Sequence, residues 1–180
     1  MKYFIFIIIS LIFLTGCSSI PASSWKSPSK IKENSYILET GDILIKKKDT
    51  GFLEWFGHCA IFVDNFTVAE FPKLGTGMHI FHISDWARGK RKIVVLRFPD
   101  LSPEFKSALI ENILKASDKN YKLVLNKKDD SGYYCSQFIW EIYYKTACQF
   151  NLNIDLDSDK GLVVFPYDFY NSKFLKEVYF

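Results

Sequence analysis

The sequence lacks a long apolar run, a glycine-rich phosphate-binding loop and internal repeats. Its apolar stretch at residues 3–14 is interrupted only by Ser10, and it is shorter than the roughly 20 residues that a membrane-spanning helix needs. The net charge of +3 comes from scattered lysines without interleaved aromatic residues, which argues against a nucleic-acid-binding protein. With 180 residues, 48% of them hydrophobic, the chain can form one core, so we expect one folded domain.

The N-terminus has the pattern of a secretory signal, because Lys2 precedes the short apolar run and small residues follow it. The letters "LTGC", Leu14 to Cys17, resemble the lipobox of bacterial lipoproteins. The resemblance implies cleavage after residue 16 and a lipid on Cys17, which would anchor the protein to a membrane of the bacterial cell envelope. The outer membrane is the expected location if the source cell has two membranes. The alternative is an uncleaved signal anchor.

Residues 17–34 are rich in serine, proline and lysine and show no apolar periodicity, so we expect the lipidated Cys17 and a flexible tether there. The folded domain then covers residues 35–180. Strand patterns at residues 43–46, 58–63 and 67–71, the last two joined by a tight turn at Asn65 and Phe66, come before two predicted helices. After the helices, residues 161–180 have the pattern of a strand, a turn at Pro166 and a final strand or short helix. The fold class is therefore α+β with a largely antiparallel sheet.

Both helices have recognisable starts. The first follows Ser102, a good N-cap residue, and Pro103, which suits the first helical position. The second is expected to begin within a few residues of Cys135 and to run to about Phe150. A cysteine in the first helical turn lies near unpaired backbone N–H groups and the positive end of the helix dipole, and both stabilise a thiolate. Cys135 is therefore a candidate nucleophile, although a buried free cysteine is also a common core residue.

A catalytic cysteine needs a histidine and a third polar group that orients the histidine ring. His58 begins a predicted strand directly after Gly57, and Glu70 lies in the strand expected to pair with it. Strand alternation places His58 on one face and Cys59 on the other, so we expect that a partner of His58 does not also contact Cys59. We therefore group Cys135, His58 and Glu70.

Cysteines beyond Cys17 number three, so at least one stays free or pairs with another chain. Cys148 is expected in the core, and a disulfide between Cys59 and Cys148 is left open. Metal binding is the rival interpretation, but the spacing of its candidate ligands is poor, so no metal and no cofactor is expected. Those candidates are Cys59, Cys135, His58, His79 and His82.

Three segments, "TGDILI", "GHCAIFVDNFTVAEF" and "GYYCSQFIWEIYY", resemble in this order the circularly permuted branch of NlpC-type papain-like cysteine hydrolases, in particular the YiiX-like proteins. The resemblance implies a permuted papain-like fold. It also implies that Cys135 is the nucleophile, His58 the general base and Glu70 the orienting acid. Asp42 matches a position taken as structural.

The same resemblance implies a covalent hydrolase of the amidase or peptidase type with a peptide or lipid amide substrate, and the peptides of peptidoglycan are one candidate. The alternatives are an acyltransferase or a lipid amidase or esterase of the same fold, and a non-catalytic binding lipoprotein. Aromatic side chains such as Trp55, Phe56, Trp86 and Trp140 are expected either in a greasy cleft or in the core. No nucleic-acid partner is expected.

Overall fold

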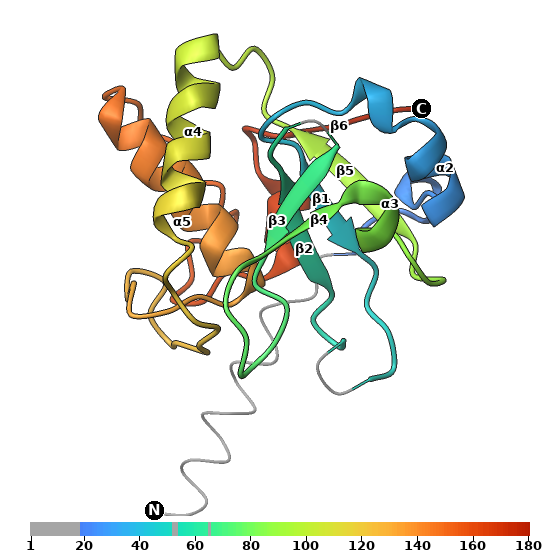
Figure 1. Ribbon diagram of the computed structural model, residues 1–180, viewed down its shortest axis with the longest axis horizontal. Coiled ribbons are helices and arrows are strands. Elements are labelled where there is room, and N and C mark those ends of the chain that lie inside the picture. Colours follow the sequence, from blue (N-terminus) through green and yellow to red (C-terminus); the bar gives the residue numbers. More distant parts are fainter. Residues whose placement is uncertain (1–18, 52–53, 65) are drawn as a thin grey trace, which may run out of the picture.

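A six-stranded antiparallel sheet lies at the centre of the computed structural model, which describes residues 19–51, 54–64 and 66–180 (Figure 1). The strands follow the order β4-β3-β2-β1-β5-β6, and every neighbouring pair is antiparallel. They are β1 (Ile43–Lys46), β2 (His58–Phe62), β3 (Thr67–Glu70), β4 (His79–His82), β5 (Ile93–Arg97) and β6 (Lys176–Glu177). The predicted α+β class with an antiparallel sheet is confirmed.

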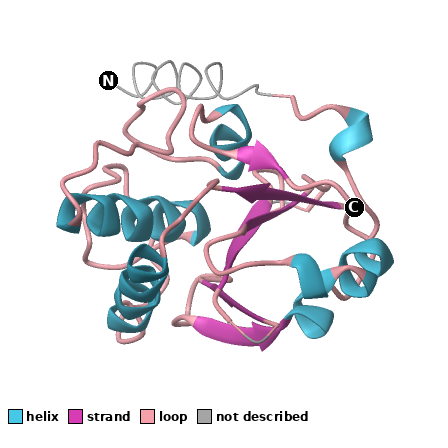
Figure 2. Ribbon diagram, turned by 90° about the horizontal axis from the view of Figure 1, so that it is seen from above, coloured by secondary structure: helices cyan, strands magenta, loops and turns pink. Residues whose placement is uncertain are grey.

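Helices cover both faces of this sheet (Figures 1 and 2). The two long helices, α4 (Pro103–Lys115) and α5 (Cys135–Gln149), pack together on one side. The short helices α2 (Pro28–Glu33) and α3 (Ile83–Trp86) lie on the other. Three 3-10 turns complete the fold: η1 (Ala22–Ser24), η2 (Ser35–Ile37) and η3 (Pro166–Asn171). Within the described ranges, no helix has the length and apolar character needed to cross a membrane.

Strand alternation divides the interior into two cores, as the sequence predicts. Cys59 and Ile61 belong to the core that includes the long helices, whereas Ala60 and Phe62 belong to the core that includes α2 and α3. Each long helix begins as expected. The Ser102 hydroxyl caps α4 by accepting the backbone N–H of Phe105 at 3.2 Å, and α5 begins at Cys135 itself.

The segment expected to be a flexible tether is folded from residue 19 onward, so that prediction is wrong over residues 19–34. Ile31 is fully buried in one core and Trp25 is buried in the other. The Ser27 side chain caps α2. The backbone of Lys26 exchanges two hydrogen bonds with the backbone of Ile93, at the start of β5. These few apolar side chains suffice to dock the segment because the sheet gives them a surface on which to bury. Cys17 lies outside the described residues.

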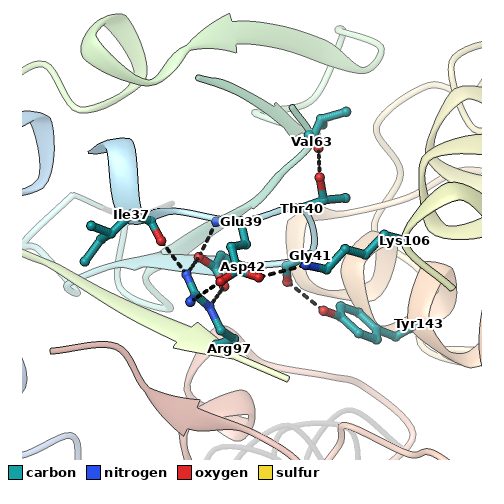
Figure 3. Close-up of polar contacts among 9 residues, drawn as sticks. All are labelled: Ile37, Glu39, Thr40, Gly41, Asp42, Val63, Arg97, Lys106 and Tyr143. Carbon is teal, nitrogen blue, oxygen red and sulfur yellow. Dashed lines mark hydrogen bonds and ion pairs between the residues drawn. The ribbon is translucent and has the colours of Figure 1, made fainter. Parts of the chain in front are cut away.

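Gly41 and Asp42 directly precede Ile43, the first residue of β1, and their contacts hold this part of the fold together (Figure 3). Asp42 is 1% exposed, and its carboxylate accepts two bonds from the Arg97 guanidinium at 2.7 Å and one from the backbone N–H of Glu39. Gly41 has a positive φ of 93°, and its carbonyl oxygen accepts the Tyr143 hydroxyl at 2.6 Å. The pair ties the start of β1 to β5 and α5.

Candidate active site

Cys135 is the first residue of α5, and the residues around it anchor this helix start. The N-cap residue Tyr134 offers no side-chain cap, so no side chain at that position occupies the N–H groups of the first turn. The Tyr134 hydroxyl accepts the backbone N–H of Val164 at 3.0 Å, and Ser136 donates to the carbonyl oxygen of Val164 at 2.8 Å. These bonds fix the first turn against residues 162–165, while α5 packs on β2.

His58 is the first residue of β2, and Gly57 brings the chain to that position with a positive φ of 82°. A Cβ at residue 57 would lie only 3.1 Å from the carbonyl oxygen of Lys46, so the close approach of the backbone requires glycine. Glu70 ends β3, one residue beyond the paired Ile61 and Ala69, on the side where β2 begins. His58 Nε2 lies 2.5 Å from Glu70 Oε2.

Glu70 is 6% exposed and also accepts a bond from the indole N–H of Trp86 at 2.5 Å. Lys46 holds Trp86 in turn, because its ammonium lies 4.0 Å from the indole ring centroid and donates to the Trp86 carbonyl oxygen at 2.6 Å. Sequence reasoning missed both residues: it placed Trp86 in a cleft or in the core and assigned Lys46 no role. Only the tertiary fold shows that the indole N–H faces a buried carboxylate.

Cys135 interacts with both His58 and Cys59, which contradicts the expectation that a partner of His58 would not also contact Cys59. Alternation does send the Cys59 side chain into the α5 core. However, His58 stands at the end of the strand, where its ring is not confined to one face of the sheet. The start of α5 lies beside the start of β2, so the Cys135 sulfur interacts with both His58 and Cys59.

These contacts set the charge state of the site. Hydrogen bonding with the Cys59 thiol, opposed by burial and supported by His58, holds the pKa of Cys135 well below its usual range. Burial by itself lowers the pKa of His58, but the interactions with Cys135 and Glu70 outweigh it and raise this pKa to about 9. At neutral pH the geometry therefore favours a thiolate on Cys135 and an imidazolium on His58.

Two further groups keep their protons near this ion pair. Burial, together with the neighbouring Cys135, raises the pKa of the Cys59 thiol well above its usual value, so Cys59 remains a donor. Burial and the charge on Cys135 likewise raise the pKa of the Tyr121 hydroxyl. Tyr121 is held in place because its backbone N–H donates to the carbonyl oxygen of Thr76 at 2.7 Å. Sequence reasoning missed Tyr121, which has no motif of its own.

The pKa of Glu70 is lowered, in contrast to the raised pKa values of Cys59 and Tyr121. Burial alone raises the pKa of Glu70, but the hydrogen bonds and charge of His58, followed by the Trp86 N–H, lower it overall. A carboxylate at this place stabilises an imidazolium and fixes the orientation of the ring.

The other cysteines and the candidate metal ligands lie as follows. Cys148 is exposed near the end of α5, so its assignment to the core is wrong. Cys59 is buried and free, and it is not bonded to Cys148 in this structure. Of the histidines proposed as metal ligands, His82 faces Ser84, with Nδ1 2.8 Å from the hydroxyl oxygen.

Three carboxylates elsewhere in the described part of the chain, those of Asp157, Asp159 and Asp168, lie close enough to share a cation. However, Asp157 already forms a buried ion pair with Lys127. The Asp168 carboxylate also accepts the backbone N–H of Phe165 at 2.6 Å, as a helix cap does. The Asp159 carboxylate accepts the backbone N–H of Gly161 at 2.8 Å, so all three carboxylates have partners within the chain.

Comparison with protein families and comparison with solved structures both find matches. Residues 37–179 match the model of a family described as permuted papain-like amidase enzymes, YaeF/YiiX, C92 family. Among solved structures, the chain is similar to the metalloprotein yiiX from Escherichia coli O157:H7, with a TM-score of 0.58 and 18% identity. That alignment covers 78% of this chain and 96% of the other and bears on the fold alone. A comparison with curated proteins finds no significant match.

Proposed function

The chain belongs to the permuted papain-like amidase family, and on that premise we propose that it is a cell-envelope cysteine hydrolase that cleaves an amide bond. Cys135 is the nucleophile, His58 the general acid and base, and Glu70 the orienting carboxylate. One observation carries the proposal: α5, β2 and β3 bring these three side chains together, with His58 bonded to Glu70 and in mutual interaction with Cys135. A structural cysteine has no need of this arrangement.

The reaction begins with attack of the Cys135 thiolate on the carbonyl carbon of the amide, which gives a tetrahedral oxyanion. Because His58 Nε2 bonds to Glu70, Nδ1 is the ring nitrogen left to exchange a proton with the Cys135 sulfur. The amide C–N bond then breaks, His58 gives its proton to the leaving amine, and a thioester remains on Cys135. His58 next takes a proton from water, which attacks the thioester and releases the carboxylic acid and the thiolate.

The backbone N–H groups at the start of α5, including that of Cys135, are the expected donors to the oxyanion. The Tyr121 hydroxyl is a second candidate donor, because it stays protonated and lies near the charge on Cys135. Glu70 and Trp86 do not touch the substrate in this scheme. They hold the His58 ring in one orientation, so both are positioning residues.

The envelope location rests on the N-terminal sequence. A cleaved signal at residues 1–16 and a lipid on Cys17 would place the catalytic domain at a membrane surface outside the cytoplasm. Peptidoglycan peptides are then within reach as substrates. A lipid amide substrate, or transfer of the acyl group to an acceptor other than water, is the second candidate, favoured by exposed leucine side chains on the loops around the site.

The test is incubation of the full chain with muropeptides and separately with N-acyl lipids, followed by mass spectrometry of the products. We expect amide cleavage in one arm, loss of that activity in Cys135→Ala, and full activity in the matched control Cys148→Ala. Incorporation of ¹⁸O from labelled water into the released acid identifies hydrolysis, and an unlabelled acyl product with a second acceptor identifies transfer. Unchanged cleavage by Cys135→Ala would refute the proposed nucleophile.

A further inference from the structure

Five large apolar side chains protrude from the loops at the end of the sheet where Cys135 lies. Strand β2 begins there, and so does α5, so the loops that precede both elements surround the site. The exposed fraction of each residue is high: Trp55 62%, Leu74 58%, Leu123 60%, Leu125 78% and Leu162 74%. We call these five residues the apolar rim.

Backbone hydrogen bonds hold the loops of the apolar rim side by side. The N–H of Tyr121 donates to Thr76, which joins the loop of Leu123 to that of Leu74. The N–H of Lys127 donates to the carbonyl oxygen of Leu162 at 2.7 Å, which joins the loop of Leu125 to that of Leu162. The loop of Trp55 is joined to the same region, because Phe56 stacks on Phe165 at 5.6 Å.

Local geometry explains why the leucines point outward. Around residues 123–125 the chain has no helix or named strand, and the burial alternates: Val124 is 7% exposed and buried, while Leu123 and Leu125 lie on the solvent side. Five such side chains gathered at one end are more than the scattered apolar residues of an ordinary surface. They come from separate loops. This arrangement suits side chains that each insert singly into a lipid bilayer.

Exposed lysines alternate with the apolar rim. Lys73 precedes Leu74, Lys122 precedes Leu123, and Lys160 lies two residues before Leu162. Two acidic residues in the same loops have basic partners, since Asp130 pairs with Lys145 and Asp157 pairs with Lys127, whereas Asp129 and Asp159 accept the backbone N–H groups of Ser131 and Gly161. This combination fits the interface of a bilayer, where leucine and tryptophan side chains enter the acyl boundary and lysines meet anionic headgroups.

The N-terminal segment joins the domain at this same end. Trp25 packs on Tyr167 at 5.7 Å, and the Tyr167 hydroxyl accepts the N–H of Lys48, in the loop that leads toward Trp55. The apolar run at residues 3–14 and Cys17 precede this segment in the sequence. Trp25, eight residues after Cys17, therefore lies at the same end of the domain as the apolar rim.

We propose that the apolar rim docks on a lipid bilayer that carries anionic headgroups, so that the end of the sheet where Cys135 lies faces the membrane surface. The proposal goes beyond the amidase function and does not depend on which bond the enzyme cleaves. It names a bilayer as the occupant because exposed leucine, tryptophan and lysine side chains are combined on loops that the N-terminal segment adjoins.

Tryptophan fluorescence offers a reporter within the full chain. Trp55 is exposed, whereas Trp25, Trp86 and Trp140 are buried. The full-length Cys135→Ala variant is reconstituted with vesicles of phosphatidylcholine and phosphatidylglycerol, in which part of the lipid carries brominated acyl chains. An N-terminal anchor alone leaves Trp55 in water, but docking of the rim brings Trp55 to the quencher.

We expect bromine quenching of one tryptophan component, its loss in Trp55→Phe, and at least a tenfold drop in the docked-to-undocked ratio for the Leu123→Ser/Leu125→Ser double variant. Leu152→Ser is the matched control, since Leu152 is 49% exposed but follows the far end of α5, about 20 Å from Cys135. Unchanged far-ultraviolet circular dichroism confirms that each variant is folded. Unquenched Trp55 in the anchored protein, or equal quenching in the double variant, would overturn the proposal.

Discussion

Removal of the Cys59 side chain gives a sharp test of how the fold activates Cys135. Cys59 is buried and keeps its proton, and its hydrogen bond is the largest single cause of the low pKa of the Cys135 thiol. In Cys59→Ala the thiolate loses this donor, whereas Cys59→Ser retains an O–H donor at the same place. We therefore expect the pKa of Cys135 to rise in the alanine variant and to rise less in the serine variant.

The size of the effect follows from the energy of the bond. A hydrogen bond to a charged group contributes about 1.5–3 kcal/mol, and about 1.4 kcal/mol changes an equilibrium constant tenfold. The thiolate fraction of Cys135 on the acid limb of its titration should thus fall about tenfold to a hundredfold in Cys59→Ala. His58 still interacts with the sulfur, so the pKa of Cys135 stays below that of a free thiol.

The assay is the rate of alkylation of Cys135 by iodoacetamide as a function of pH, with the modified peptide quantified by mass spectrometry. The acid limb should move to higher pH in Cys59→Ala and return toward the wild-type position in Cys59→Ser. Thermal unfolding of both variants separates this effect from loss of the fold. An acid limb that coincides in wild type and Cys59→Ala would refute the reasoning.

Three further outcomes are expected. Glu70→Gln should lower kcat/KM about 10²- to 10⁴-fold, because the His58 imidazolium loses its carboxylate partner; activity within threefold of wild type would contradict the positioning role. The pKa of His58 is raised to about 9, so the ion pair with Cys135 persists at neutral pH. Activity should therefore decline through about pH 9, as the imidazolium loses its proton. A rate that still climbs from pH 8 to pH 10 would contradict this charge state. Trp25→Ala should lower the free energy of unfolding in urea by about 3–5 kcal/mol, whereas the exposed Lys32→Ala should have little effect; equal midpoints for the two would show that residues 19–34 are a loose tether after all.

Much of the fold can be predicted from patterns of residues that are close in the sequence. The Ser102–Pro103 start of α4 and the placement of Cys135 at the start of α5 depend on residues adjacent in the chain, so the sequence predicts them well. Pairing of β2 with β3 depends on a short hairpin, which made the proximity of His58 and Glu70 predictable. These features involve short separations and one dominant interaction each.

Contacts between distant segments were harder to predict. The Trp86 indole bonds to Glu70 across 16 residues, and Lys46 lies over Trp86 from 40 residues away, so no local pattern announces either contact. The packing of Trp25 was missed because a serine- and lysine-rich composition describes a segment's average character. Its burial depends on a surface formed by residues far along the chain.

The central claim is that His58 activates Cys135, and labelling by an electrophilic thiol probe tests it most directly. Wild type should be labelled rapidly at Cys135 at pH 7, His58→Ala should be labelled at least tenfold more slowly, and His82→Ala should match wild type because His82 is an exposed residue of β4. Equal labelling rates at Cys135 in wild type and His58→Ala, with both proteins folded, would contradict the account.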